Sequence, residues 1–229
     1  MNNKKRYAVV PSAGCGSRMG GVSKPNIKLL GKTLFEYVLE AFEQSMVDEI
    51  VAVCSEDNEN SLFELAKGFK KPVHLVRGGE SRAESVYNGI SACVDADIIC
   101  VHDCARPFIT KEIINETIEA AEKFGAACVC APLIDTVKYK DPDSGVVSTP
   151  NRANLFAVQT PQTFKKEIYL SAMEKVEDIS RFTDETSLIE FGGNRVEYIT
   201  HGETNMKLTA LDDVPMAEIL MKRRLKTND

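Results

Sequence analysis

The sequence lacks the features that mark membrane-spanning and exported proteins. No apolar run approaches the ~20 residues that a membrane-spanning helix needs. Residues 1–6 are polar and basic, without an apolar stretch of signal-peptide length, so nothing in them directs export. With 229 residues, 43% of them hydrophobic, the chain is long and apolar enough for one large globular domain with a sizeable core.

The cysteines lack a pairing pattern. There are seven, an odd number, scattered among apolar neighbours, and none forms a Cys-x-x-Cys pair. Disulfide frameworks and most zinc sites show regular cysteine spacing. We therefore expect reduced thiols and a cytoplasmic protein, and a zinc site at Cys128 and Cys130 is the weaker alternative.

The sequence also lacks a basic tract. Acidic residues outnumber basic ones, 34 against 28, and the motifs of RNA-binding domains are missing. Extended nucleic acid is thus not an expected partner. A small polyanion is compatible with the net charge of -6, because a few converging cations and one metal ion can outweigh it locally.

What the sequence does contain is a glycine-rich loop near its N-terminus. The apolar residues 8–10 predict a short buried strand, and the sequence SAGCGSRM follows at residues 12–19. Small residues let the backbone turn tightly and point successive N–H groups into one concavity, which binds anions. Arg18 and Lys24 lie close enough in sequence to add positive charge to the same group. The stretch therefore predicts a phosphate site.

Three known phosphate loops compete for this stretch. A Walker A loop ending at Gly31-Lys32-Thr33 would need a glycine where Asn26 stands. A dinucleotide-binding fingerprint would need a glycine where Met19 stands. The loop of the nucleotidyltransferases, with small residues, an Arg-Met pair and a later lysine, resembles the stretch position by position. An ordinary strand-to-helix turn would explain the glycines but not the two cations.

Periodicity beyond the loop predicts alternating helices and strands. The helix signals include capping boxes at residues 33–36 and 81–84, and a cap at Thr110 with Gly125 as the stop. Because the strands are short, apolar throughout and separated by helices, we predict an α/β fold: a Rossmann-like open, mostly parallel sheet with helices on both faces. The expected strands are residues 8–10, 49–54, 73–76, 97–101, 126–131 and 195–199, and the expected helices are residues 34–42, 59–69, 82–93, 111–124, 165–176, 184–191 and a last one after residue 213.

Residues 135–159 depart from this alternation. Val137 and Tyr139 alternate with polar residues, residues 141–145 form a strong turn, and residues 146–149 lead back. We predict a protruding β-hairpin arm. Because an isolated hairpin is marginally stable in water, the arm should pack against either its own domain or a second subunit.

Polar side chains follow the third, fourth and fifth predicted strands, at residues 78–85, 102–107 and 135–136. The carboxyl ends of parallel strands form the binding crevice of an open sheet. Asp103 is the candidate ligand for Mg2+, which takes one or two carboxylates together with phosphate oxygens and water. A turn cap or a salt bridge with Arg106 are the alternatives for this carboxylate, and we expect His102 to pack within the strand end.

One set of motifs extends over almost the whole chain. It comprises the loop with Lys24, Gly78–Gly89, Val101–Pro107, Asp135–Lys138, Arg152 with Gln159–Gln162, Thr183–Glu185, and Asn205–Thr209. In this order the motifs resemble the 2-C-methyl-D-erythritol 4-phosphate cytidylyltransferases. The resemblance implies one domain over residues 1–229 with the fold of the nucleotide-diphospho-sugar transferases. It implies transfer of CMP from CTP to 2-C-methyl-D-erythritol 4-phosphate in non-mevalonate isoprenoid biosynthesis, by a homodimer whose hairpin arms, residues 135–159, embrace.

The resemblance also implies roles for single residues. The catalytic residues would be Arg18, Lys24 and Lys207. Those around CTP would be Ala13, Gly14, Gly16, Gly79, Glu80, Arg82 and Ser85. Those around the acceptor phosphate would be Asp103, Arg106, Thr136, Arg152, Thr160, Thr183 and Lys207. Thr136 and Arg152 would reach the other subunit's site, and Asp103 would also bind Mg2+ or another divalent cation.

Two departures and three rival functions remain. Ser23-Lys24-Pro25 stands where the family usually has Pro-Lys-Gln, which leaves Lys28 as a substitute for Lys24, and Cys104 stands where alanine is preferred.

The first alternative function is that of a sister cytidylyltransferase, which uses D-ribitol 5-phosphate for wall teichoic acid synthesis. The rivals from other classes are a nucleotide-binding regulator and a nicotinamide dehydrogenase. The dehydrogenase would need an acidic residue after the second strand, which Glu56 or Asp57 could imitate.

Overall fold

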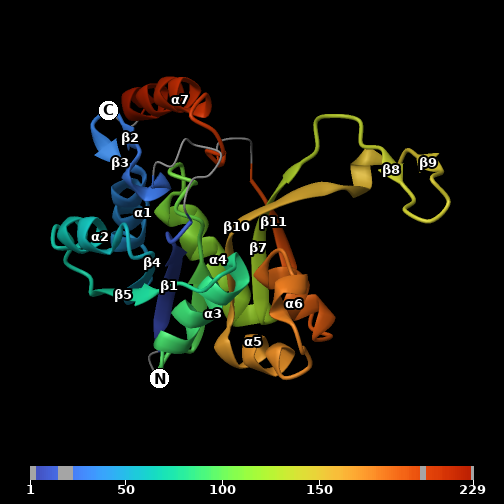
Figure 1. Ribbon diagram of the computed structural model, residues 1–229, viewed down its shortest axis with the longest axis horizontal. Coiled ribbons are helices and arrows are strands. Elements are labelled where there is room, and N and C mark those ends of the chain that lie inside the picture. The colour runs from blue at the N-terminus through green and yellow to red at the C-terminus, as the bar shows by residue number, and fades with distance from the viewer. Residues whose placement is uncertain (1–3, 15–22, 202–204, 228–229) are drawn as a thin grey trace.

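A seven-stranded sheet forms the centre of the molecule, in the order β11-β7-β10-β6-β1-β4-β5 (Figure 1). The computed structural model describes residues 4–14, 23–201 and 205–227. Every neighbouring pair is parallel except the two pairs that involve β10, so the predicted mostly parallel sheet is confirmed. The strands are β1 (Arg6–Pro11), β4 (Glu49–Cys54), β5 (Val73–Arg77), β6 (Ile98–Val101), β7 (Ala126–Pro132), β10 (Phe156–Lys165) and β11 (Glu197–Thr200).

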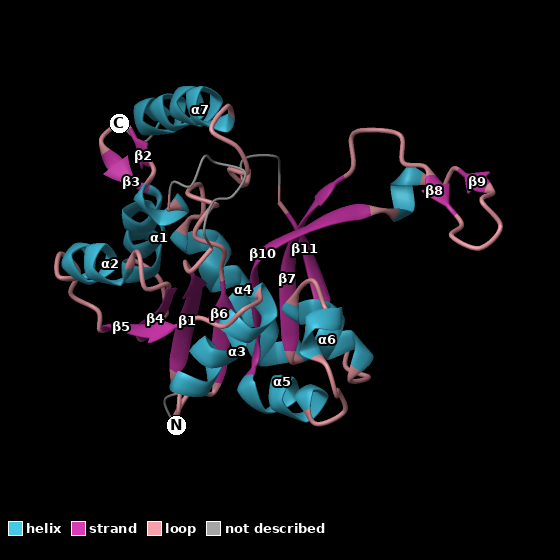
Figure 2. Cartoon of the chain, viewed as in Figure 1, coloured by secondary structure: helices cyan, strands magenta, loops and turns pink. Residues whose placement is uncertain are grey.

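Helices cover both faces of the sheet, as the apolar strands predict (Figure 2). On β1, Ala8 and Val10 join one buried cluster while Tyr7 and Val9 join the other. The first cluster takes its helical residues from α1 (Leu34–Glu43), α2 (Glu59–Ala66), α4 (Lys111–Phe124) and α7 (Asp213–Thr227). The second takes them from α3 (Arg82–Ala92), α5 (Lys166–Met173) and α6 (Glu185–Phe191).

Side-chain caps fix where the helices begin. Thr33 with Glu36 and Ser81 with Glu84 form the two predicted capping boxes, which start α1 and α3. Thr110 caps α4 through the N–H of Ile113, and the helix ends at Gly125, whose φ of 101° favours glycine. The cap at Ser81 is the one that matters for function, because it places Arg82 at the carboxyl edge of the sheet.

One central element was not predicted. β10 runs antiparallel between β6 and β7, whereas the sequence pattern assigned its first residues to the arm and left the rest as a connection. Pro161 lies in the strand and its register shifts between Val158 and Gln162. Proline is rare within a central strand, so the pattern argued against a strand here. Two helices are also shorter than predicted: α2 ends at Ala66 and α5 at Met173.

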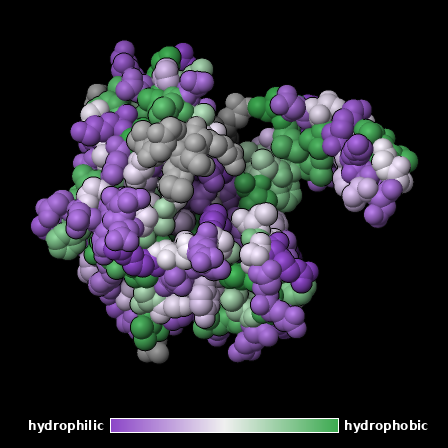
Figure 3. All heavy atoms as spheres, viewed as in Figure 1, coloured by the Kyte–Doolittle hydropathy of each residue, from purple (hydrophilic) through white to green (hydrophobic). Residues whose placement is uncertain are grey.

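The predicted hairpin arm extends away from the sheet (Figure 1). Its strands β8 (Tyr139–Lys140) and β9 (Val147–Ser148) have two residues each and pair with one another. Apolar side chains on the arm are exposed, among them Tyr139, Val146 and Val147, and apolar surface is visible on it in Figure 3.

Within the described residues, no helix has both the length and the apolar character needed to cross a membrane.

Candidate active site

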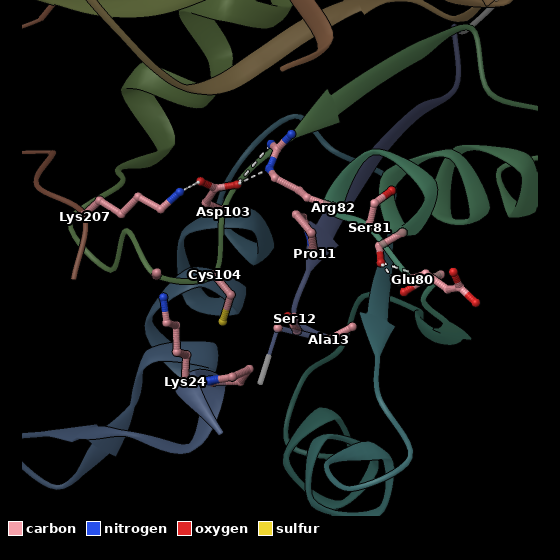
Figure 4. A pocket seen from close by; sticks show the side chains of 15 residues that line it. Pro11, Ser12, Ala13, Lys24, Glu80, Ser81, Arg82, Asp103, Cys104 and Lys207 are labelled. Atoms are coloured by element: carbon pink, nitrogen blue, oxygen red, sulfur yellow. Dashed lines mark hydrogen bonds and ion pairs between the residues drawn. The ribbon is translucent and has the colours of Figure 1, made fainter. Parts of the chain in front are cut away.

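A cavity of about 370 Å³ lies at the carboxyl edge of the sheet, where the crevice was predicted. It is lined by five segments: the end of β1, the turn at Lys24, the start of α3 with the residues that lead into it, the loop after β6 and the segment before α7 that carries Lys207 (Figure 4). The lining residues are Pro11, Ser12, Ala13, Gly14, Lys24, Pro25, Gly79, Glu80, Ser81, Arg82, Ser85, Asp103, Cys104, Ala105 and Lys207. The sequence-based assignment had already named Ala13, Gly14, Lys24, Gly79, Glu80, Arg82, Ser85, Asp103 and Lys207.

Asp103 lies between two cations in this cavity (Figure 4). Arg82 donates to its Oδ1 from Nε at 3.3 Å and from Nη2 at 3.1 Å, and Lys207 Nζ donates to Oδ2 at 2.5 Å. Burial by itself would raise the pKa of Asp103, but Arg82 and Lys207 outweigh it and hold that pKa well below its usual range. The carboxylate is therefore ionised at neutral pH. The alternative salt bridge with Arg106 does not form.

Glu185 is a member of the site that the residue assignment missed. Arg82 donates to both of its carboxylate oxygens, from Nη1 at 2.8 Å and from Nη2 at 3.1 Å. Burial raises the pKa of Glu185, and its pairing with Arg82 offsets part of that rise. Gln162 on β10 accepts the N–H groups of Glu185 and Thr186, which fixes the start of α6. The signal for Glu185 was its place in the Thr183–Glu185 motif.

His102 has the structural role that its position predicted. The carbonyl of Arg106 can only accept, so Nε2 of His102 donates to it at 3.1 Å and Nδ1 is the acceptor. Thr160 Oγ1 then donates to Nδ1 at 3.0 Å while it accepts from the N–H of Asp103 at 3.1 Å. Burial lowers the pKa of His102 to about 4, so the ring is neutral. Thr160 thereby holds the Asp103 backbone to β10.

Arg106 lies behind the cavity rather than in its wall. The side chain is buried, and Nη1 donates to the backbone carbonyl of Asn205 at 2.8 Å. Its Nε and Asn205 Oδ1 are buried without a hydrogen-bond partner among the described residues. No described carboxylate forms a salt bridge with this guanidinium, so its charge is poorly compensated.

Close packing against α3 explains why residues 78 and 79, beside the cavity, are glycines. A Cβ on Gly78 would lie 2.7 Å from Ser85 Oγ, and one on Gly79 would lie 2.5 Å from Glu84 Cβ. The N–H of Gly79 donates to Ser85 Oγ at 3.1 Å, so the backbone packs directly on the first turns of α3. This close approach leaves the space beside Ser85 open for a ligand.

The two candidate lysines differ in position. Lys24 starts a 3-10 turn (Lys24–Asn26) and lines the cavity. Lys28 is exposed in the two-residue strand β2 (Lys28–Leu29), which pairs with β3 (Lys32–Thr33), and it does not line the cavity. Gly31 is in the turn of this small hairpin, at a φ of 92°, and not in a phosphate loop. The predicted Gly16 and Arg18 lie outside the described residues.

Five predicted acceptor residues do not line the cavity: Arg106 and Thr160, which are buried, and Thr136, Arg152 and Thr183, which are exposed. Thr136 and Arg152 are exposed on the arm, and Arg152 Nη1 donates to the carbonyl of Ile134. Thr183 is exposed just before α6.

In the described parts of the chain, no three His, Cys, Asp or Glu side chains are grouped as a metal site. The donor chemistry at Asp103 still fits Mg2+, because that ion commonly binds through one carboxylate with phosphate oxygens and water supplying the rest. Cys104 lines the same cavity, and burial raises the pKa of its thiol to about 12, so it stays protonated.

Comparison with known proteins adds a family to this geometry. The family model described as 2-C-methyl-D-erythritol 4-phosphate cytidylyltransferase matches residues 7–223. The enzyme of that name from Caldanaerobacter subterraneus subsp. tengcongensis is 38% identical over 223 residues, covering 94% of this chain and 98% of its own. The crystal structure of 4-diphosphocytidyl-2C-methyl-D-erythritol synthase from Anaerococcus prevotii superposes with a TM-score of 0.85 at 28% identity, covering 96% of both chains. The Thermus thermophilus 2-C-methyl-D-erythritol 4-phosphate cytidylyltransferase gives 0.73 at 25% identity, with 95% of this chain and 99% of that chain covered.

Proposed function

Because the chain belongs to the 2-C-methyl-D-erythritol 4-phosphate cytidylyltransferase family, we propose that the cavity at the carboxyl edge of its sheet binds CTP and the acceptor phosphate together. The reaction is transfer of CMP from CTP to 2-C-methyl-D-erythritol 4-phosphate, which gives 4-diphosphocytidyl-2-C-methylerythritol and pyrophosphate. The observation that carries the site assignment is the convergence of Lys24, Arg82, Asp103 and Lys207 on one cavity.

The nucleotide occupies the side of the cavity between β1 and α3. Ala13 and Gly14 offer backbone N–H groups to the phosphates, as a nest of amides at a strand end does. Gly79 precedes α3 and Ser85 lies in its first turn. Both line the cavity, and the cytosine base would lie against them. Lys24, with Arg18 from the loop, supplies the positive charge that the triphosphate requires.

The acceptor needs no general base. A phosphate monoester is largely dianionic at neutral pH, since its second pKa is about 6. Its oxygen attacks the α-phosphorus while pyrophosphate leaves, so the enzyme has to position both reactants in line and neutralise charge. Lys207, which lines the cavity, is suited to hold the acceptor phosphate, and Arg106 would add its charge from behind the cavity wall. The buried, poorly compensated guanidinium of Arg106 supports this role, because an anion would satisfy it.

Asp103 would hold the divalent cation, with Mg2+ as the expected ion. When bound, such an ion would neutralise charge on the nucleotide phosphates and favour departure of pyrophosphate. The protein's own contribution is an ionised carboxylate whose backbone is fixed to Thr160 and whose oxygens face Arg82 and Lys207.

We further propose that the enzyme is a homodimer that works in the cytoplasm. The exposed apolar residues Tyr139, Val146 and Val147 on the arm favour burial against a second copy, which would bring Thr136 and Arg152 to the partner's site. The six described cysteines are buried free thiols, which suits a reducing compartment.

The acceptor is tested by measuring pyrophosphate release from CTP and Mg2+ with each polyol phosphate in separate reactions. We expect release with 2-C-methyl-D-erythritol 4-phosphate and none with D-ribitol 5-phosphate, an alternative that the comparisons do not favour. Release with D-ribitol 5-phosphate alone would contradict the acceptor. Folded protein that releases pyrophosphate with neither would contradict the catalytic assignment.

A further inference from the structure

The segment that carries Lys24 has little regular structure, so its neighbours must decide where the ammonium lies. Lys24 opens a single 3-10 turn that ends at Asn26. Misplacing a reacting or stabilising group by about 1 Å can cost about 100-fold in rate. The hydrogen bonds that hold Ser23 and Asn26, on either side of Lys24, therefore matter for the position of Lys24 in the cavity.

Asn58 joins the two ends of the phosphate loop. Its Nδ2 donates to the carbonyl of Ser12, the first residue of the loop, at 2.8 Å, and to Ser23 Oγ, after the loop, at 3.1 Å. Its Oδ1 accepts the N–H of Ser55 at 2.9 Å, and these partners fix which end of the amide faces the loop. Asn58 is only 1% exposed, so water does not compete for these bonds.

Asn58 does not use its side-chain oxygen for the helix cap that its position offers. It is the residue before α2, where an asparagine side chain commonly accepts an N–H of its own helix. Here the side chain caps nothing on α2. Oδ1, the atom that would cap the helix, accepts the N–H of Ser55 instead, and Nδ2, which cannot cap, donates to partners 46 and 35 positions away. The two Nδ2 bonds therefore fix the ends of the loop and not the helix.

A second contact attaches the other side of Lys24 to the same helix. Asn26 Nδ2 donates to Ser61 Oγ at 3.0 Å, and Ser61 Oγ donates to the carbonyl of Asn58 at 2.8 Å. Residues on both sides of Lys24 are thus attached to the first turn of α2.

We propose that Asn58 is a positioning residue: it closes the phosphate loop at Ser12 and Ser23 and so sets Lys24 in the cavity. The inference rests on the catalytic role given to Lys24 in the proposed function. It extends that role to a buried neutral residue on a helix that contributes nothing to the cavity wall.

The test is a double-mutant cycle. Asn58→Asp keeps the acceptor for Ser55 but cannot donate to Ser12 or Ser23, and Ser23→Ala removes one contact without changing charge. Each is made in the wild-type and in the Lys24→Ala background, and kcat and KM for CTP are measured. Asn115→Asp is the matched control, because Asn115 Oδ1 accepts the N–H of Met46 on an element that does not line the cavity.

We expect Asn58→Asp to lower kcat about tenfold and Ser23→Ala about threefold, the range that loss of one or two hydrogen bonds allows. In the Lys24→Ala background the same changes should leave kcat within about twofold, since the residue that they position is gone. Asn115→Asp should leave kcat unchanged.

Two outcomes would overturn the proposal: wild-type kcat in both Asn58→Asp and Ser23→Ala, or equal losses in the two backgrounds. If Asn58→Asp does not unfold cooperatively, Ser23→Ala alone decides. Failure of the proposed function is distinguishable, because it would appear as wild-type kcat in Lys24→Ala by itself.

Discussion

The cavity and the arm are stabilised in opposite ways. The charged groups of the cavity are satisfied within the chain: Arg82 contacts both Asp103 and Glu185, and Lys207 contacts Asp103. The arm has strands of two residues and leaves apolar side chains such as Val147 exposed. The difference indicates that the sheet holds the chemistry in place by itself, whereas the arm calls for burial against another surface.

The largest expected effect is at the centre of the cavity. Asp103→Asn should lower kcat on the order of 100-fold, because it removes the carboxylate that faces Arg82, Lys207 and the expected metal ion. The same exchange on the arm, Asp143→Asn, should leave kcat unchanged because Asp143 is exposed there. Steady-state pyrophosphate release from both variants checks this. Similar kcat values in the two would remove the distinction between the regions.

Glu185→Gln should have a smaller effect, on KM. The amide keeps the shape of Glu185 but loses the charge that orients Arg82, and a hydrogen bond to a charged group is worth about 1.5–3 kcal/mol. We expect KM for CTP to rise about tenfold, since about 1.4 kcal/mol corresponds to that factor. Glu177→Gln, an exposed acid with the same change of charge, is the control. An unchanged KM in Glu185→Gln would show that Arg82 is held without it.

His102 predicts how stability depends on pH. Its pKa is lowered to about 4 in the folded state, against about 6.5 when unfolded, so the unfolded chain binds the extra proton as the pH falls. The neutral His102 thus contributes to the free energy of unfolding. This contribution is complete above about pH 6.5 and is lost progressively toward pH 4. From pH 7.5 to pH 5.5 it amounts to about 1.4 kcal/mol.

Urea unfolding at the two pH values measures this loss. In His102→Gln the fall in unfolding free energy should be smaller by that amount, whatever the stability of the variant at pH 7.5. Equal falls in wild type and variant would contradict a neutral buried imidazole.

The smallest expected effect concerns the arm. Val147→Asp should weaken the proposed dimer at least about fivefold, since loss of an apolar interface contact costs about 1 kcal/mol and symmetry repeats the change. Val94→Asp, at a valine that is 83% exposed on the body, should have no effect on association. Sedimentation equilibrium gives both dissociation constants. If both substitutions weaken dimerisation, or if neither does, the arm is not the dimer interface.

Much of the fold could be predicted because its signals are local. Capping residues such as Ser81 and Thr110 mark helix starts by hydrogen bonds within one turn, and they were located correctly. β10 could not be recognised, because its place between β6 and β7 depends on long-range pairing and it contains Pro161. Boundaries such as the end of α2 depend on tertiary contacts as well.

The residues of the site likewise divide into those that the local sequence indicates and those that it does not. Asp103 could be named because it lies two residues after the end of a buried strand, and the sheet fixes where such a residue lies. Lys207 was assigned through the resemblance alone, since its segment has no helix or strand pattern. Glu185 and Asn58 lie at helix starts, where acids and asparagines are common for reasons of capping, so nothing local separates their contacts from ordinary caps.

In the proposed mechanism Lys24, and not Lys28, supplies the catalytic positive charge. The most direct measurement is kcat for pyrophosphate release by Lys24→Ala and Lys28→Ala at saturating CTP, Mg2+ and 2-C-methyl-D-erythritol 4-phosphate, with thermal unfolding recorded for both. We expect a folded Lys24→Ala enzyme slowed by about 100-fold or more and a Lys28→Ala enzyme close to wild type. Wild-type turnover in Lys24→Ala, or the loss appearing in Lys28→Ala instead, would contradict it.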